Sequence, residues 1–231
     1  MQGILYGIGV GPGDPELLTL KGLRVIKASD VIALPAKDKE SCTSYSIVKG
    51  AYTELDEKEF IYLDYPMSKD KELLKRCRDE NEKIVMDMLD KGKSIAFLTL
   101  GDPTIYSTYI YLHKSICEKG YQAEIISGIP SFVAAAGVVS DSLCEADEQI
   151  HILPATYGID EVGYLKGTKV LMKAGTKLKE IKKYVKEKDC VVYSIENLYL
   201  PNENIVTDKN DIKEKGGYFT TVIIKDKGTN R

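Results

Sequence analysis

The sequence has few residues that could bind a metal ion. Its 231 residues include only two histidines, His113 and His151, and five cysteines, at positions 42, 77, 117, 144 and 190. No two cysteines form a Cys-x-x-Cys pair, and neither histidine lies at a ligand spacing from a cysteine or from the other histidine. Protein metal sites need three or four such side chains at defined spacings. We therefore expect reduced, mostly buried thiols and no protein-bound metal, so that any metal would arrive inside a ligand.

The sequence also lacks an excess of positive charge, a long hydrophobic run and a targeting segment. The net charge is −3, which argues against a protein that binds nucleic acid. The longest apolar run, at about positions 132–139, is far too short to cross a bilayer. The first residues, MQGILYG, enter a glycine-rich strand without a basic segment or a cleavage site. We expect a cytoplasmic protein with no membrane partner.

Short apolar runs alternate with helical patterns along the first half of the chain, which is typical of βαβ units and a mainly parallel sheet. A charged segment at positions 36–44 is expected to be a mobile surface loop. After about position 140 the strand candidates outnumber the helices, which favours a sheet with antiparallel pairs. We expect two α/β domains, 1–124 and 125–231, the first with a mainly parallel sheet and the second with a mixed one. The expected strands cover positions 4–10, 31–34, 94–100, 123–126, 149–153, 169–173, 190–194, 204–207 and 218–224, and the expected helices 19–28, 68–91, a segment ending at 118, 131–139 and 177–186.

Two glycine-rich segments resemble nucleotide-binding loops but fail the tests for them. In Gly7-Ile-Gly-Val-Gly-Pro-Gly-Asp-Pro, the third glycine of a Gly-x-Gly-x-x-Gly dinucleotide motif is replaced by Pro12 or by Asp14, depending on where the motif starts. The Gly92-Lys93-Ser94 triplet lacks the first P-loop glycine, because Asp87 occupies that place. Neither an NAD-binding nor an ATP-binding loop is therefore expected.

Gly-Asp-Pro occurs twice, at positions 13–15 and 101–103, each time after an expected strand. Glycine lets the backbone approach a ligand closely, and proline fixes the shape of a loop. A carboxylate in such a loop suits hydroxyls, amines and cations better than phosphate. A ribose with a positively charged centre, as in S-adenosylmethionine, would fit. The alternative is that both motifs are ordinary tight turns, with Asp14 as a turn or capping residue.

Six segments, in order, resemble those of the tetrapyrrole methylase family, the class III S-adenosylmethionine-dependent methyltransferases. They read GIGVGPGDPELLTLKG, LTLGDPTIYST, SGIPSFVAAAG, VLMKAG, IENLYLPNENI and YFTTVIIK. Within the family they most resemble the enzymes that methylate carbon 20 of precorrin-2 or cobalt-factor II in cobalamin biosynthesis. The resemblance implies two α/β domains with the ligand in the trough between them, S-adenosylmethionine as the methyl donor, a reduced tetrapyrrole as the acceptor, and a homodimer.

The resemblance also implies which residues contact the donor. Asp102 would hold its polar part. Asp102, Tyr106 or a propionate of the substrate could accept the proton that leaves the methylated carbon, and no dedicated base is assigned. Ser127 stands where many relatives have proline, which makes that loop less rigid. Lys21, Arg24, Lys37 and Lys39 are candidates for contacts to substrate carboxylates. The full set of expected donor-binding residues is Pro12, Gly101, Asp102, Ile105, Tyr106, Pro130, Ser131, Phe132, Ala174, Asn197, Leu198, Thr220 and Thr221.

Four alternatives stay open at this point. The chain could methylate a different tetrapyrrole carbon or diphthine on a translation factor, which keeps the reaction type and changes the acceptor. It could act on ribosomal RNA ribose, which its acidity disfavours. It could also be a nucleotide-binding module without catalysis.

Overall fold

The computed structural model describes residues 2–66, 68 and 70–227. The chain divides into two compact units, Met1–Pro130 and Ser131–Arg231. The division falls after Pro130 rather than after position 124, because the strand Gln122–Ile126 (β5) pairs with the first strand up to Ile126 and so belongs to the first sheet.

The first unit contains a fully parallel five-stranded sheet, as the alternating pattern predicted. Its strands are β1 (Ile4–Gly9), β2 (Val31–Leu34), β3 (Glu59–Tyr62), β4 (Ile95–Thr99) and β5, in the order β3-β2-β4-β1-β5. Four of these were expected within two residues at either end. Strand β4 lies in the middle of this order. It is buried along its whole length, because helices cover both faces of the sheet.

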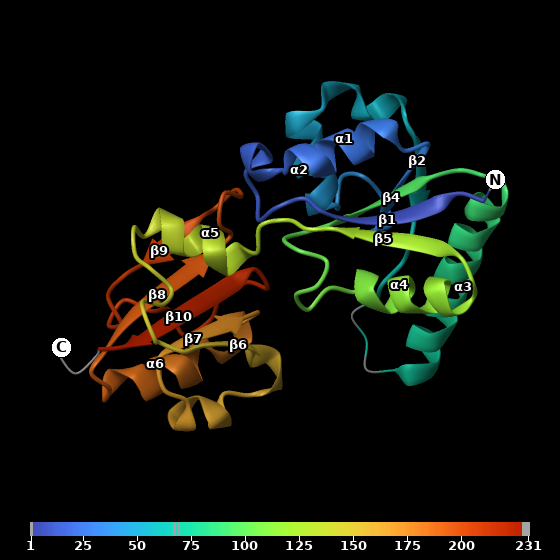
Figure 1. Ribbon diagram of the computed structural model, residues 1–231. Coiled ribbons are helices and arrows are strands. Elements are labelled where there is room, and N and C mark those ends of the chain that lie inside the picture. The colour runs from blue at the N-terminus through green and yellow to red at the C-terminus, as the bar shows by residue number, and fades with distance from the viewer. Residues whose placement is uncertain (1, 67, 69, 228–231) are drawn as a thin grey trace. The chain divides into compact units, whose positions relative to one another are not determined.

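Helices α1 (Leu20–Ala28) and α2 (Thr43–Ala51) cover one face of this sheet, and α3 (Lys71–Asp90) and α4 (Tyr109–Glu118) cover the other (Figure 1). Successive strand residues point to opposite faces. Accordingly, Ile8 and Leu98 pack in the core beneath α1 and α2, whereas Leu5 and Phe97 pack in the core beneath α3 and α4. The unit therefore has two hydrophobic cores, one on each side of the sheet.

The helix starts follow the polar side chains before them. The Thr19 hydroxyl oxygen accepts a hydrogen bond from the backbone N–H of Gly22 at the start of α1. The Asp70 carboxylate caps α3 by accepting from the N–H groups of Glu72 and Leu73. The helix expected over 68–91 is thus confirmed as α3, and position 69 of that range lies outside the described residues.

The segment expected to be a charged loop at 36–44 ends earlier, because α2 begins at Thr43. Sequence analysis missed both α2 and β3. The α2 sequence TSYSIVKGA is rich in residues of low helix propensity, so its stability comes from burial of Ile47 and Val48 and from the Ser44 hydroxyl, which donates to the Leu98 carbonyl. Two short 3₁₀ helices, η1 (Pro15–Leu17) and η2 (Thr53–Glu57), complete this face.

The second unit contains a mixed five-stranded sheet, which confirms the expected change of pattern. The strands are β6 (Ile150–Pro154), β7 (Thr168–Met172), β8 (Cys190–Glu196), β9 (Asn204–Val206) and β10 (Thr220–Asp226), in the order β6-β7-β10-β8-β9. Only β6 and β7 pair in parallel among these strands. Helices α5 (Ser131–Val138) and α6 (Leu178–Lys186) lie on opposite faces of this sheet (Figure 1). Three short 3₁₀ helices lie in its loops: η3 (Ala155–Tyr157), η4 (Asp160–Tyr164) and η5 (Gly175–Lys177).

Within the described part of the chain, no helix combines the length and the apolar character needed to cross a bilayer.

Candidate functional site

The strand order of the first unit creates a switch point between β1 and β4. The chain leaves β1 to build β2 and β3 on one side, and it leaves β4 to build β5 on the other. In open α/β sheets, ligands bind at the carboxyl ends of the strands beside such a point. Here those ends carry the two Gly-Asp-Pro loops. The loops are joined by a backbone bridge in which Gly101 N–H donates to the Gly11 carbonyl at 2.8 Å.

Three glycines bring the loops after β1, β4 and β5 into backbone contact. A Cβ atom on Gly128 would lie 2.2 Å from the Gly101 carbonyl oxygen, and one on Gly9 would lie 2.5 Å from the Gly128 nitrogen. Both distances are too short for any side chain. Gly101 also has φ +70, in the left-handed region that favours glycine. Gly9 and Gly128 are therefore required by this three-loop contact, and Gly101 is favoured by its backbone conformation.

The Asp102 carboxylate connects two of these loops. It is buried, with 7% of the residue exposed. Its Oδ1 accepts from the Thr104 N–H at 2.8 Å and from the Thr104 hydroxyl at 2.5 Å, and its Oδ2 accepts from the Gly128 N–H at 2.9 Å. The acid between Gly101 and Pro103 thus fixes the loop after β4 against the loop after β5.

The other expected residues of the first unit lie around this contact. Pro12 is buried, and Ile105 is half-buried with its N–H donating to the Asp102 carbonyl. The Pro130 Cα atom would be 3.9 Å from a Cβ on Gly101. Tyr106 has φ +48, which is a strained conformation for an aromatic residue, and it is 42% exposed. Backbone strain of this kind concentrates at functional sites.

The expected residues of the second unit also form a cluster. The Ala174 N–H donates to the Thr220 carbonyl at 2.8 Å, and the Asn197 N–H donates to the Phe219 carbonyl at 3.0 Å. These bonds join the carboxyl ends of β7 and β8 to the start of β10. Four of the five residues in this cluster are buried, and Asn197 has φ +54; the buried ones are Ala174, Leu198, Thr220 and Thr221.

Ser131 and Phe132 begin α5, and the Phe132 side chain is buried. The expected donor-binding residues are therefore divided between the two units. Those of the first unit lie in loops after strands, and those of the second lie at the start of α5, in loops after β7 and β8, and at the start of β10. Their roles toward a donor stay predictions.

Sequence analysis missed the role of Glu196. Its Oε1 accepts from the Gly217 N–H at 2.5 Å, and its Oε2 lies 3.5 Å from the Lys213 ammonium. A Cβ on Gly175 would lie 2.0 Å from the Gly217 carbonyl oxygen. Glu196 therefore holds the Gly216-Gly217 turn against Gly175, directly before Thr220. The adjacent glycines were the only sequence signal for this packing.

Some polar groups near the site have structural partners. Tyr109 is buried under Gly7, and its hydroxyl donates to the Glu124 carbonyl at 3.1 Å; burial raises its pKa well above the usual range, so it stays protonated. Burial lowers the pKa of His113, whose Nδ1 lies 3.1 Å from the Tyr109 hydroxyl. Of the four basic candidates, Lys39 is paired with Asp56 at 2.6 Å.

The cysteines are all free, with Cys42, Cys77 and Cys190 buried and Cys117 and Cys144 exposed. Across residues 2–66, 68 and 70–227, no group of three or more His, Cys, Asp or Glu side chains is placed to hold a metal ion.

The model of the tetrapyrrole (corrin/porphyrin) methylases matches residues 4–212 of the sequence. The chain belongs to this family. The resemblance drawn from the six segments is confirmed, and so is the two-sheet α/β fold.

Known relatives share nearly the full length of this methylase. It is 33% identical over 225 residues to the probable cobalt-precorrin-2 C(20)-methyltransferase of Methanocaldococcus jannaschii, a match that covers 96% of this chain and 95% of that protein. It is 29% identical over 242 residues to the precorrin-2 C(20)-methyltransferase of a Sinorhizobium species, with 96% and 95% covered. A solved structure of the uroporphyrin-III C-methyltransferase of Thermus thermophilus, complexed with S-adenosylhomocysteine, has the same fold, with a TM-score of 0.70, 20% identity and 96% and 97% of the two chains covered.

Proposed function

We propose that this methylase transfers the methyl group of S-adenosylmethionine to carbon 20 of precorrin-2 or cobalt-factor II in cobalamin biosynthesis. The observation that carries the proposal is the 33% identity, over almost all of both chains, to a protein named as a probable cobalt-precorrin-2 C(20)-methyltransferase. A second relative with the same position in its name supports it. Membership of the family supports methyl transfer to a tetrapyrrole. The assignment of the methylated position to carbon 20 is based on the names of these two relatives.

We further propose that the expected donor-binding residues contact the donor. The Asp102 carboxylate suits this role, because two carboxylate oxygens offer about four acceptor positions and three are used internally. The remaining position can accept from a ribose hydroxyl or an amino group. A Cβ on Gly101 would meet the Pro130 Cα atom no closer than 3.9 Å, so the backbone beside Asp102 leaves room for a ligand to approach. The S-adenosylhomocysteine complex of a protein with the same fold also supports this donor.

The chemistry needs little from protein acids and bases. A sulfonium donor supplies an activated methyl group, and an electron-rich bridging carbon of the reduced tetrapyrrole is the nucleophile. The contribution of the chain is then to align the two reactants and to exclude water. Because Asp102 is committed to three hydrogen bonds, we propose that it shapes the loop and does not take the proton from carbon 20. Tyr106 and a substrate propionate are the remaining acceptors for that proton.

The test is an anaerobic assay with enzymatically prepared precorrin-2, with and without inserted cobalt, and donor carrying a ¹³C-labelled methyl group. We expect a mass increase of one methyl group and a ¹³C resonance assigned to a methyl on carbon 20. A ¹³C label on a different carbon would show that the enzyme does not methylate carbon 20, although it would still be a tetrapyrrole methyltransferase. Donor-product binding without transfer to any tetrapyrrole would favour a non-catalytic module. The relative rates with the two acceptors identify the natural one.

We also propose that the protein acts as a homodimer in the cytoplasm, as the family resemblance implies. Light scattering on the purified protein should give twice the 25.7 kDa mass of the chain. A mass equal to that of one chain at micromolar concentration would refute the dimer.

A further inference from the structure

Lys173 occupies a backbone conformation that normally selects glycine. It directly follows β7 and has φ +56. The left-handed conformation is unfavourable for a residue with a Cβ atom, and glycine adopts it freely. The next residue, Ala174, is buried and donates to the Thr220 carbonyl, so the backbone is held in place directly after Lys173. Backbone strain of this kind is concentrated at functional sites, so the Lys173 side chain is a candidate for a function.

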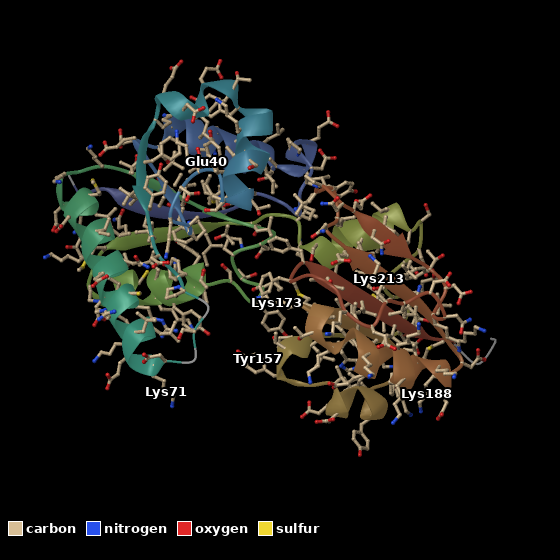
Figure 2. All side chains as sticks on the ribbon, turned by 180° about the vertical axis from the view of Figure 1, so that it is seen from behind. Glu40, Lys71, Tyr157, Lys173, Lys188 and Lys213 are labelled. Atoms are coloured by element: carbon tan, nitrogen blue, oxygen red, sulfur yellow. The ribbon has the colours of Figure 1, made fainter. Side chains whose placement is uncertain are left out.

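An exposed aromatic pair lies beside this lysine. Tyr218 and Phe219 immediately precede β10, and they are 45% and 38% exposed. Their rings are 5.4 Å apart in an edge-to-face arrangement. Lys173 is labelled in Figure 2. Its ammonium lies 5.3 Å from the centre of the Tyr218 ring. One cation and two aromatic side chains therefore share a surface of the second unit.

This surface is continuous with the cluster of expected donor-binding residues. The Phe219 carbonyl accepts from the Asn197 N–H, and Lys173 directly precedes Ala174. Large aromatic side chains are hydrophobic, yet Tyr218 and Phe219 do not belong to the hydrophobic core of the second unit. Their chemistry suits a conjugated ring system, and the lysine suits a carboxylate on its rim.

We propose that Lys173, Tyr218 and Phe219 form a recognition patch for the acceptor. The aromatic side chains would contact the face of a tetrapyrrole, and the Lys173 ammonium would bind one of its carboxylates. This inference rests on the proposed function, and it assigns acceptor specificity to residues outside the expected donor-binding set.

The test uses uroporphyrin III, a stable fluorescent porphyrin with eight carboxylates, as the probe in fluorescence titrations of the intact protein. We expect Lys173→Ala and Lys173→Gly to weaken porphyrin binding about tenfold, the loss expected for one charge-assisted contact. Lys173→Arg should retain most of the affinity, and Tyr218→Ala should also weaken it. The matched control is Lys179→Ala, which removes an equally charged lysine with 78% of its side chain exposed on α6.

Three further measurements separate recognition from folding and from the donor site. Lys173→Gly should have a Tm equal to or above that of the wild type, because it relieves the left-handed strain. Its affinity for S-adenosylhomocysteine should match that of the wild type, and with the natural acceptor its KM should rise more than its kcat falls.

The proposal is overturned by equal porphyrin affinity in Lys173→Ala and wild type, by an equal loss in Lys179→Ala, or by no porphyrin binding to the wild type. Failure of the proposed function has a different signature, namely a wild-type protein that neither binds S-adenosylhomocysteine nor transfers a methyl group. The comparison of Lys173 and Lys179 variants is independent of that result.

Discussion

At the scale of single residues, Asp102 determines the shape of the loop after β4. Replacing it with alanine leaves the partly buried N–H of Gly128 and the Thr104 hydroxyl without their acceptor. We expect Asp102→Ala to lower the free energy of unfolding by about 2–4 kcal/mol and to weaken S-adenosylhomocysteine binding at least tenfold. Denaturant unfolding and calorimetric titration measure the two effects.

Thr104→Val is the control for Asp102→Ala, because it removes only the hydroxyl bond and leaves the contact with Gly128. Its cost should be about 0.5–1.5 kcal/mol. If Asp102→Ala is as stable as the wild type, the carboxylate does not hold the loops together. If it is destabilised but binds S-adenosylhomocysteine normally, Asp102 lies outside the donor site.

Gly128 and Gly137 provide a matched pair of glycine substitutions. A Cβ on Gly128 would overlap the backbone of Gly101 and Gly9, whereas one on Gly137 in α5 would have no atom within 4 Å. Gly128→Ala should therefore lower Tm strongly or prevent folding, since backbone atoms must move. Gly137→Ala should raise stability by about 0.5–1 kcal/mol, because alanine is the better helix former. Thermal unfolding of the two variants checks both expectations, and a soluble Gly128→Ala protein with wild-type Tm contradicts the three-loop contact.

At the scale of elements, a polar network attaches the segment after α5 to the sheet of the second unit. The Asp141 carboxylate accepts from the Tyr193 hydroxyl of β8 and from the Lys225 ammonium of β10, both at 2.7 Å. Burial alone would raise the pKa of Asp141, but the hydrogen bonds from Lys225 and Tyr193 outweigh it and the pKa lies below the ordinary value of 3.8. Burial, followed by the bond to Asp141, raises the pKa of Tyr193 to about 12.

This network should stabilise the second unit in a pH-dependent way. Because the pKa of Asp141 is lower in the folded state, its stabilisation is complete above pH 3.8 and is lost as the pH falls through the folded-state value. Asp141→Asn should cost about 1–3 kcal/mol at pH 7, and the difference from wild type should shrink below about pH 4. Asp189→Asn, which removes an exposed partner of Lys227, should change stability little. A difference that is constant between pH 7 and pH 2 would show that Asp141 does not contribute through its charge.

The elements that could be predicted from the sequence are those with a clear hydrophobic pattern or helix cap within their own residues. The strand at 31–34 matches β2, and the long amphipathic pattern of α3 has a clear acidic cap in Asp70. The last strand was expected to begin at 218, but β10 begins at Thr220, because Tyr218 and Phe219 are apolar without being buried strand residues. β3 was missed, since its four residues are too short a run to distinguish from a loop.

The candidate site could be predicted as a set of residues but not as an arrangement. The sequence marks Gly101 and Asp102 as unusual through the repeated Gly-Asp-Pro motif. It cannot indicate that Asp102 bonds to Gly128, because that contact joins residues 26 positions apart and depends on the strand order β4-β1-β5. Lys173 was not singled out either, since its unusual feature is a φ angle and not a residue pattern.

At the scale of the whole molecule, the chain consists of two compact units with separate hydrophobic cores. Ile8 and Phe97 belong to the two cores of the first unit, and Leu171 and Val222 belong to the core of the second. Substitutions without shared partners usually have additive effects, and local opening follows the cooperative unit in which a residue lies. Asp102→Ala and Asp141→Asn should therefore act on different parts of the chain.

Hydrogen exchange followed by mass spectrometry can test this separation in the intact protein. We expect Asp102→Ala to speed exchange in peptides from β4 and β5 and to leave β10 unchanged, because its lost hydrogen bonds lie within the first unit. Asp141→Asn should speed exchange in β8 and β10 only. The double variant should show both changes, each of the size seen in the single variant. If either substitution accelerates exchange in the other sheet as strongly as in its own, the two units open cooperatively, and the stability effects predicted for the two sites cannot be independent.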